Sequence, residues 1–245
     1  MKLTLADTKF LKDSISAIAD LVTEVRFKVT SNGLELVAMD PANVAMVLFT
    51  LLSSSFIEYE VKKDTVIALN LNDLKQVLRR VKPADTLTLE NPDAKLKVTL
   101  KGKSTRTFQL PLIDIEEREQ KVPDLKFNVT VTTAASTIND AIEDVDIIGE
   151  SVVFSADEKA FTISSSNDLS TAEVELKADD ETSIDAKEET RSKYSIEYLK
   201  KMIQGAKLAD TVTVQFSKDY PLRLDYTVKD KMQLAFILAP RVDND

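Results

Sequence analysis

Residues 71–90 read LNDLKQVLRRVKPADTLTLE, and residues 196–215 repeat their pattern as IEYLKKMIQGAKLADTVTVQ. At this offset of 125 residues, the apolar positions of the two stretches coincide one by one. Their spacing of three and four predicts an amphipathic helix over 71–82 and another over 196–207. Each helix precedes the same Lys-x-Ala-Asp-Thr-x-Thr segment, and Pro83 is expected to end the first helix. The chain therefore repeats one helix-and-strand pattern.

Further segments repeat at nearly the same offset. The helix-like stretch 7–21 matches 133–147 at 127 residues, and the alternating residues around Phe27 match those around Phe154 at the same distance. The last strand-like segments of the two halves match at 126 residues. Because these separate segments agree within three residues, we infer an internal duplication.

Strand-like alternation surrounds the two helices of each half. Residues 25–29 alternate apolar and polar side chains, Ser31-Asn32-Gly33 supplies a turn, and the alternation resumes over 34–38. The same period recurs at 96–100, 106–112, 171–176, 212–216 and 222–226. This pattern predicts an α+β fold with two similar domains, in each of which two helices pack on antiparallel β-sheet.

The boundary between the halves is expected at residues 114–126, where eight of thirteen residues are charged. The segment has neither a helical stripe nor strand alternation, so we predict an extended, solvated connector. The two domains are then residues 1–113 and residues 127–245.

The residue types that are missing exclude many functions. The chain has no His and no Cys, which removes thiolate chemistry, the Ser-His-Asp triad and the common zinc sites. Its four glycines lie too far apart for a phosphate-wrapping loop. We therefore expect no catalytic residue, no metal and no cofactor. A carboxylate-based hydrolase such as a glycosidase stays open, although the chain has no Trp and only 6% aromatic residues to stack against a sugar.

Neither a targeting segment nor a membrane segment is expected. Residues 1–13 lack an apolar signal core, and the longest apolar stretch, 44–52, is too short to span a bilayer. We expect a soluble, intracellular protein without a membrane partner.

The formal net charge of −9 argues against nucleic acid as a partner, but the charges are unevenly distributed. The predicted helix 71–82 has a net charge of +3, and its repeat 196–207 has a net charge of +2. A helical projection puts these cations on or beside the face opposite the apolar stripe, where they can contact phosphates without reading sequence. A solvated helix face is the alternative. The residues predicted to contact DNA are Lys9, Lys12, Lys75, Arg79, Arg80, Lys82, Lys200, Lys201 and Lys207.

The helix-like stretch 133–147 is acidic and contains no cation. Asp140 and Asp144 stand four residues apart and so share one helical face. Such a face would repel DNA unless a cation neutralises it, and a solvated acidic face is the alternative. If copies of the chain associate head to tail, this face could meet cations of the next copy, namely Arg80, Lys82 or Arg106.

Three segments are distinctive for their composition and order: LVAMDPANV at 36–44, TRTFQLPLID at 105–114 and LAPRV at 238–242. Together with the internal duplication and its connector, they closely resemble PCNA-type sliding clamps, especially archaeal ones, over the whole chain. Asn43 and Ile237 stand where eukaryotic members carry His and Tyr, which fits an archaeal origin.

The resemblance implies a DNA clamp fold in which three subunits form a ring around duplex DNA. Such a ring is a non-enzymatic processivity factor for replication and repair, and it acts in the cytoplasm of archaea or the nucleus of eukaryotes. It tethers DNA polymerase, flap endonuclease and DNA ligase, and the clamp loader replication factor C opens it. A homotrimer is the expected assembly, a heterotrimer of paralogues is the alternative, and a protein scaffold that shares the fold without binding DNA is the rival function.

The resemblance also implies a pocket beneath the connector for a short hydrophobic-aromatic client peptide, the PIP box. An apolar floor beside an extended segment can bury an anchor side chain and pair with the peptide backbone. Carried over by position, the pocket residues are Met39, Val44, Ile115, Val122, Pro123, Pro221, Ile237, Ala239, Pro240 and Arg241.

Subunit contact in the family joins the strand before the connector to an edge strand of the second domain. The matching segments here are 107–113 and 171–177, and the second would be an aggregation hazard if it stayed unpaired. The residues expected at this contact are Arg80, Lys82, Arg106, Thr107, Phe108, Leu110, Asp140, Asp144, Thr171, Val174 and Leu176.

Overall fold

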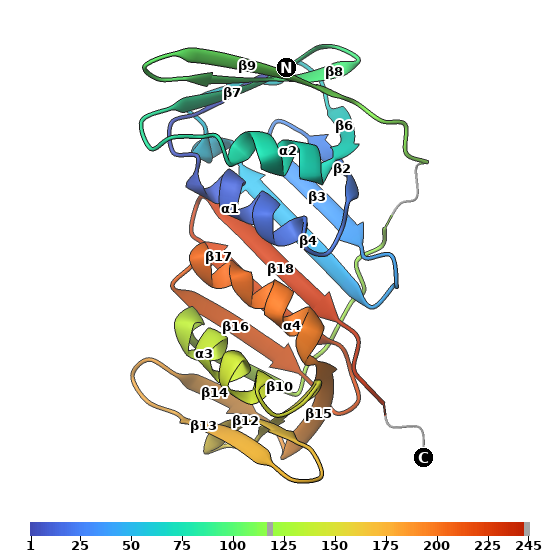
Figure 1. Cartoon of the computed structure of the whole chain (residues 1–245). Helices are drawn as coiled ribbons and strands as arrows, with labels where there is room; N and C mark the ends of the chain where they lie inside the picture. Colours follow the sequence, from blue (N-terminus) through green and yellow to red (C-terminus); the bar gives the residue numbers. More distant parts are fainter. Residues whose placement is uncertain (117–119, 243–245) are drawn as a thin grey trace. The chain divides into compact units, whose positions relative to one another are not determined.

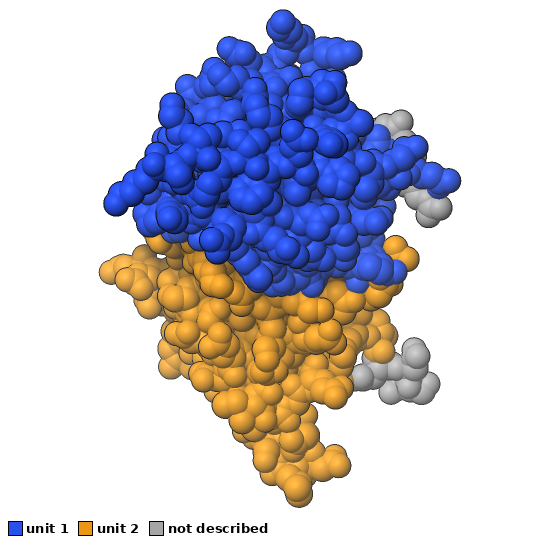
Figure 2. Space-filling view, turned by 45° about the horizontal axis from the view of Figure 1, so that its top comes forward, with its two compact units in different colours: residues 1–41, 47–121, 228–234 blue, residues 42–46, 122–227, 235–245 orange. Residues whose placement is uncertain are grey.

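The computed structural model describes residues 1–116 and 120–242, which form two compact units (Figure 2). Unit 1 contains residues 1–41, 47–121 and 228–234, and unit 2 contains residues 42–46, 122–227 and 235–245. Residues 117–119 of the predicted connector and 243–245 of the predicted second domain lie outside the described residues.

The described residues of unit 1 form two antiparallel sheet regions and two α-helices (Figure 1). The first region has the strand order β5-β1-β7-β8-β9 and consists of β1 (Lys2–Leu5), β5 (Glu58–Glu60), β7 (Thr86–Asp93), β8 (Lys95–Lys101) and β9 (Thr105–Pro111). The second has the order β4-β3-β2-β6 and consists of β2 (Glu24–Val29), β3 (Gly33–Met39), β4 (Ala45–Leu52) and β6 (Thr65–Asn70). The helices are α1 (Lys9–Ile18), α2 (Leu71–Leu78) and the 3-10 helix η1 (Ser53–Ser55).

Unit 2 repeats this composition. One sheet has the order β13-β12-β11-β15 and consists of β11 (Ser151–Ala156), β12 (Ala160–Ser166), β13 (Thr171–Lys177) and β15 (Thr190–Ser195). The other region has the order β14-β10-β16-β17-β18 and consists of β10 (Val129–Ala134), β14 (Ser183–Ala186), β16 (Thr211–Phe216), β17 (Leu222–Val228) and β18 (Met232–Leu238). The helices are α3 (Ala135–Asp146), α4 (Ile196–Met202) and the 3-10 helix η2 (Ile203–Lys207).

The predicted α+β class is confirmed, with two α-helices among antiparallel strands in each unit. Within each unit the two helices contact each other: α1 contacts α2, and α3 contacts α4. The described residues between β9 and β10 form neither helix nor strand, in line with the absence of periodicity in that segment.

The hairpin between β2 and β3 depends on a glycine. Strands β2 and β3 pair through Phe27 and Leu36, as their alternation predicts. A Cβ atom on Gly33 would lie 2.4 Å from the backbone oxygen of Leu51, so no other residue fits at this point.

The helix predicted over 71–82 is shorter than its apolar spacing indicates, whereas the helix predicted over 196–207 is observed over that range as α4 followed by the 3-10 helix η2. Helix α2 ends at Leu78, five residues before Pro83. Beyond it, the backbone N–H of Lys82 donates to the Asp85 carboxylate at 2.7 Å instead of continuing the helix. In the repeat, α4 passes into η2 at Ile203, where a Cβ atom on Gly205 would lie 2.4 Å from the Tyr226 ring.

Each unit buries its own apolar core. The helices contribute Leu11, Ile15 and Leu74 in unit 1 and Ile138 and Ile142 in unit 2, each at most 2% exposed. In unit 2 the core also holds contacting aromatic rings, contributed by Phe154, Phe161, Tyr194 and Phe216. Aromatic contacts of this kind add stabilisation beyond the burial of their area.

Candidate functional site

The residues predicted to contact DNA lie on the helix pairs of the two units or in the turns that follow them. Lys9 and Lys12 belong to α1, and Lys75 to α2; Arg79, Arg80 and Lys82 follow α2; Lys200 and Lys201 belong to α4, and Lys207 ends η2. Most of these side chains are exposed, whereas Lys12, Lys75 and Lys201 are half-buried. The structure thus groups the cations on the helices of each unit, and their contact with DNA stays a prediction.

Lys75 does not project from the helix surface as the helical projection predicts. Its side chain is only 14% exposed, and its Nζ lies 2.7 Å from the Asp20 carboxylate and donates to the Ser16 carbonyl oxygen at 3.2 Å. Asp20 follows α1, so this ion pair joins the two helices of unit 1. The prediction was wrong for this side chain because a projection of one helix does not include the neighbouring helix.

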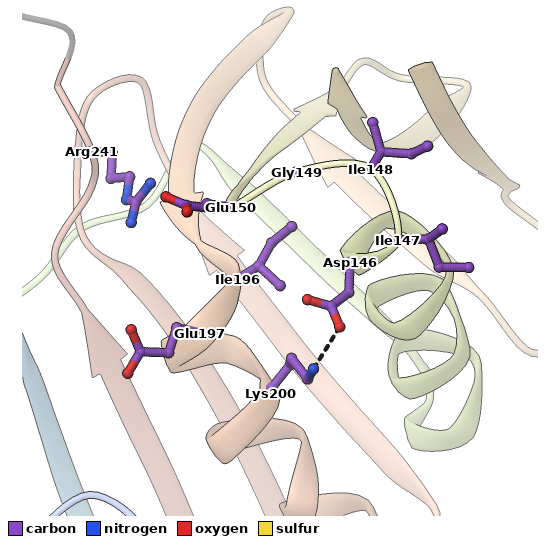
Figure 3. Close-up of a pocket in the computed structure, with 9 residues that line it drawn as sticks. All are labelled: Asp146, Ile147, Ile148, Gly149, Glu150, Ile196, Glu197, Lys200 and Arg241. Atoms are coloured by element: carbon purple, nitrogen blue, oxygen red, sulfur yellow. Dashed lines mark hydrogen bonds and ion pairs between the residues drawn. The ribbon is translucent and has the colours of Figure 1, made fainter. Parts of the chain in front are cut away.

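The duplication has preserved this interhelix ion pair. In unit 2, the Nζ of Lys200 on α4 lies 2.5 Å from the Asp146 carboxylate at the end of α3 (Figure 3). The two lysines are 125 residues apart and the two aspartates 126 residues apart, which matches the repeat offset. In each unit, therefore, one lysine of the second helix forms an ion pair with an aspartate at the end of the first helix.

The other two cations of the unit 2 helices also have neighbours on their own segment. Lys201 Nζ lies 3.1 Å from the Glu197 carboxylate and 5.1 Å from the centroid of the Tyr198 ring. Lys207 Nζ donates to the side-chain oxygen of Gln204 at 2.6 Å. Such surface contacts contribute little to stability, but they partly neutralise the charge that the helix presents.

The predicted acidic helix is α3. Asp140 and Asp144 are exposed, and in the part of the chain that the structure describes neither forms an ion pair. Glu143 beside them accepts a hydrogen bond from the Asn139 amide at 3.1 Å. Unit 2 thus presents carboxylates that its own described residues leave unneutralised.

One of the three cations predicted to meet this acidic face is engaged inside its own unit. The Arg106 guanidinium donates to the Asp85 carboxylate and, through Nη1, to the Arg80 carbonyl oxygen at 2.7 Å. Two hydrogen bonds hold the pKa of Asp85 below its ordinary value. The larger effect comes from the backbone N–H of Lys82 and the smaller one from the Arg106 side chain, and burial of the carboxylate opposes both. Arg80 and Lys82 are exposed, so they are more accessible to a neighbouring copy than Arg106.

We expect an Asp85→Asn variant to melt at a lower temperature than the unaltered protein near neutral pH. A depressed pKa means that the carboxylate stabilises the fold above its unfolded pKa and that this contribution disappears as the pH falls through the folded pKa. The difference in melting temperature should therefore shrink below about pH 4. Thermal melts over a pH series measure it, with Asp168→Asn in an exposed turn as the control. A difference that stays constant into acid would contradict the assignment.

The two strands predicted at the subunit contact both lie at sheet edges. Strand β9 ends the order β5-β1-β7-β8-β9, and β13 begins the order β13-β12-β11-β15. Both strands alternate exposed and half-buried residues along their whole length. Phe108 and Leu110 of β9, like Val174 and Leu176 of β13, are half-buried, whereas Thr107 and Thr171 are exposed. Each edge therefore keeps an apolar face that its own sheet covers only in part.

The residues predicted to bind a client peptide fall in both units. Met39 and Ile115 belong to unit 1 and are half-buried, and the other eight belong to unit 2. Of those eight, Ile237 is buried, Val44, Pro221, Ala239 and Pro240 are half-buried, and Val122, Pro123 and Arg241 are exposed.

Within unit 2, backbone contacts position part of this set. The backbone N–H of Ala239 donates to the Val44 carbonyl oxygen at 2.9 Å. The sequence reasoning missed an aromatic pair beside Pro221, in which the rings of Phe127 and Tyr220 lie 5.9 Å apart. Phe127 directly follows the predicted connector, and the position of this aromatic residue at the end of a charged segment was the available signal.

Arg241 also borders a hollow of about 580 Å³ in unit 2 (Figure 3). Its Nη1 donates to the Ser151 hydroxyl at 2.6 Å, and its backbone N–H donates to the Lys193 carbonyl oxygen at 2.7 Å. Carboxylates and cations line the hollow together, since Asp146, Glu150 and Glu197 face it with Lys200 and Arg241. This mixture of charges favours no single ligand.

Among the helices in the described residues, none is both long and apolar enough to cross a membrane.

Known proteins resemble the chain over its whole length. The family model for the N-terminal domain of proliferating cell nuclear antigen matches residues 1–120, and the model for its C-terminal domain matches residues 121–241. The DNA polymerase sliding clamp of Thermococcus gammatolerans is 38% identical over 96% of both chains. That of Pyrococcus furiosus is 37% identical over 94% of this chain and 93% of its own. A crystal structure described as PCNA from Thermococcus kodakaraensis has a TM-score of 0.92 and 27% identity, and covers 98% of this chain and 99% of its own.

Proposed function

Because the chain belongs to the proliferating cell nuclear antigen family, we propose that three copies of it close into a ring around duplex DNA. The chain is a DNA polymerase sliding clamp, a processivity factor and not an enzyme, and its partners are DNA and a DNA polymerase. A ring that surrounds DNA stays bound through its topology, so the protein needs no tight contact and can slide.

The two edge strands carry the proposal of a ring. We infer that β9 of one copy pairs with β13 of the next, because each edge has unpaired backbone groups and a half-covered apolar face. The two edges differ, so the contact is head to tail and repeats around a ring. Exposed Asp140 and Asp144 on α3 would meet Arg80 and Lys82 of the neighbour. We propose a homotrimer, with a heterotrimer of related chains as the alternative assembly.

The cations of the helices are proposed to line the ring and to contact phosphates without reading sequence. This role is assigned to exposed or half-buried side chains that have no interhelix partner. These are Lys9, Lys12, Arg79, Arg80, Lys82, Lys201 and Lys207. Lys75 and Lys200 are assigned instead to holding the helix pairs together.

Clients are proposed to dock by a PIP-box peptide beside the connector. Exposed Val122 and Pro123 offer apolar contacts to such a peptide, and half-buried Pro221 adds a third. The proposed clients are a DNA polymerase, a flap endonuclease and a DNA ligase, and the proposed loader is replication factor C. The proposed location is the cytoplasm of an archaeal cell, at replication forks.

Polymerase extension on primed circular DNA tests the function directly. With the loader present, the protein should increase the length of product that each polymerase makes before it dissociates, and linearising the template should remove the effect. Light scattering coupled to size exclusion should give the mass of three chains. A scaffold that does not bind DNA would form an assembly but leave the polymerase unaffected, and a carboxylate hydrolase would leave it unaffected without assembling.

A further inference from the structure

The turn between β2 and β3 contains a chemically reactive pair of residues. Asn32 is followed by Gly33, and no other asparagine in the sequence precedes a glycine. The backbone nitrogen of the residue after an asparagine can attack the side-chain amide carbon and close a succinimide ring. A glycine at that position leaves the attack unhindered, because it has no Cβ atom. The turn therefore contains the pair of residues in which this ring closes most readily.

The fold requires the glycine of this pair. A Cβ atom at Gly33 would lie 2.4 Å from the backbone oxygen of Leu51 in β4, so a side chain at this position would push β4 away. The pairing of β2 with β3 begins next to the turn, at Val29 and Leu34. A substitution of Gly33 would therefore disturb both neighbours of β3, and only a change at Asn32 can remove the reactive pair without disturbing the hairpin.

The Asn32 side chain is free to react. It is exposed, and among the described residues it forms no hydrogen bond. Asn167, in the turn between β12 and β13, shows the opposite arrangement. Its Nδ2 donates to the Ile148 carbonyl oxygen at 2.7 Å, and its Oδ1 accepts the backbone N–H groups of Leu169 and Ser170 at 2.9 and 2.8 Å. These bonds hold the amide of Asn167 in place, whereas the amide of Asn32 can rotate toward the next backbone nitrogen.

We propose that Asn32 is a site of spontaneous deamidation, at which the backbone nitrogen of Gly33 displaces the side-chain amide group. The nitrogen gives its proton to a base in the solvent and forms a bond to Cγ of Asn32. The bond from Cγ to Nδ2 breaks, and Nδ2 takes up a proton and leaves as ammonia. Water is the only other reactant: its hydroxyl adds to one of the two carbonyl carbons of the succinimide, and its proton returns to the Gly33 nitrogen. This modification does not depend on the proposed function.

The point at which water opens the ring decides the product. Opening at Cγ gives an ordinary aspartate, whereas opening at the main-chain carbonyl carbon gives an isoaspartate, in which the chain continues through the former side chain. In the unmodified turn, the Asn32 carbonyl oxygen accepts the Ser53 N–H at 2.9 Å, and the Thr30 N–H donates to the Gly33 carbonyl oxygen at 3.0 Å. The isoaspartate adds a methylene to the chain before Gly33 and turns the first of these carbonyls into a free carboxylate. The two hydrogen bonds then cannot both keep their geometry.

The bond from Ser53 belongs to a wider set of hydrogen bonds in unit 1. Ser53 begins η1, and the two other serines of η1 bond to the turn after β17. The Ser54 hydroxyl donates to the Asp230 carbonyl oxygen at 2.6 Å, and the Ser55 hydroxyl donates to the Lys231 carbonyl oxygen at 2.9 Å. A displacement of Ser53 therefore reaches a segment far away in the sequence. The isoaspartyl form is accordingly less stable than the unmodified protein.

The test follows two exposed asparagines in the same sample. The full chain is incubated below its melting temperature over a series of pH values and then digested, and mass spectrometry measures at each asparagine the conversion of amide to carboxylate. Asn72 is the internal control, because it is exposed and its side chain has no hydrogen bond among the described residues, but Asp73 follows it. We expect Asn32 to convert at least about tenfold faster than Asn72, since only Asn32 precedes a glycine.

Two further readouts identify the chemistry. The rate at Asn32 should rise with pH, because the attacking nitrogen must lose its proton. An isoaspartyl methyltransferase with a labelled methyl donor should label the incubated protein but not the fresh protein. An Asn32→Gln variant keeps an amide but has a longer side chain, which disfavours ring closure, so it should gain no label. The incubated unaltered protein should melt at a lower temperature than before, whereas the variant should not change. If Asn32→Gln fails to fold, Asn32→Ser replaces it.

Either of two results would overturn the modification site. In the first, Asn32 converts no faster than Asn72. In the second, Asn32 converts in the chain unfolded by urea but stays intact in the folded chain, which would mean that the hairpin protects it. A melting temperature that stays unchanged although isoaspartate has formed would overturn the loss of stability and leave the modification site in place.

Discussion

An Asp140→Lys/Asp144→Lys variant is expected to sediment as a single chain at a concentration where the unaltered protein is expected to sediment as a trimer. Both carboxylates are exposed on α3, so reversing them leaves the core of unit 2 intact. In the proposed ring they face Arg80 and Lys82 of the neighbour, and like charges brought together at an interface cost several kcal/mol. We expect association to weaken by about 100-fold or more, which corresponds to about 3 kcal/mol. Analytical ultracentrifugation over a dilution series measures the change.

A matched control separates the proposed contact from the general effect of charge. Glu158→Lys/Glu181→Lys makes the same change in net charge at two exposed turn residues of unit 2. This control should stay trimeric. Adding Arg80→Glu/Lys82→Glu to the α3 variant should restore part of the association, because opposite charges then face each other across the contact again. An α3 variant that sediments as the unaltered protein does would rule out this ion-pair contact.

The duplication made most of the fold predictable. Apolar residues at matching positions, such as Phe27 and Phe154, reveal a repeated core even though the surrounding polar residues have diverged. The alternation in 106–112 and 171–176 predicted strands, and both became edge strands, β9 and β13. The spacing of apolar residues indicates which side of a helix or strand is buried, and this spacing can be determined from a short stretch of sequence alone.

Helix ends and ion pairs were less predictable because they depend on distant parts of the chain. Helix α2 ends early where Asp85 accepts the Lys82 N–H, and Asp85 in turn is held by Arg106 from β9. Likewise the sequence places Lys75 on a polar helix face, but the approach of Asp20 decides that it forms an interhelix pair. Two lysines of one helix, such as Lys200 and Lys201, can thus have different kinds of partner, and the sequence alone does not distinguish them.

The candidate site was predictable only where charged residues of one sign lie together in a single segment of the sequence. The basic character of 71–82 and the acidic character of 133–147 are visible in the sequence, and the structure keeps both on helices. The contact between Phe127 and Tyr220 was not predictable, because it joins the end of the connector to a turn more than ninety residues later. The resemblance supplied the neighbouring Pro221, since a family motif carries spatial information that composition lacks.

A substitution in the connector is expected to produce the second large effect, a loss of affinity for the client peptide. A Val122→Asp variant should bind a PIP-box peptide about 10 to 100 times more weakly than the unaltered protein, which is the effect of removing a well-placed apolar contact at an interface. The valine side chain is 42% exposed, so the substitution puts no carboxylate into the core and should leave the melting temperature unchanged. Calorimetric titration with a synthetic peptide measures the affinity.

Val66→Asp is the matched control, because Val66 is 48% exposed and undergoes the same chemical change, but on strand β6. Its peptide affinity should equal that of the unaltered protein. The Val122 variant should still form trimers and still be loaded on circular DNA, yet it should fail to stimulate the polymerase, since the proposed assembly contact and the proposed client site use different residues of the chain. Equal peptide affinity in the two variants would remove Val122 from the client site. Loss of both assembly and peptide binding would mean that the connector supports the ring itself.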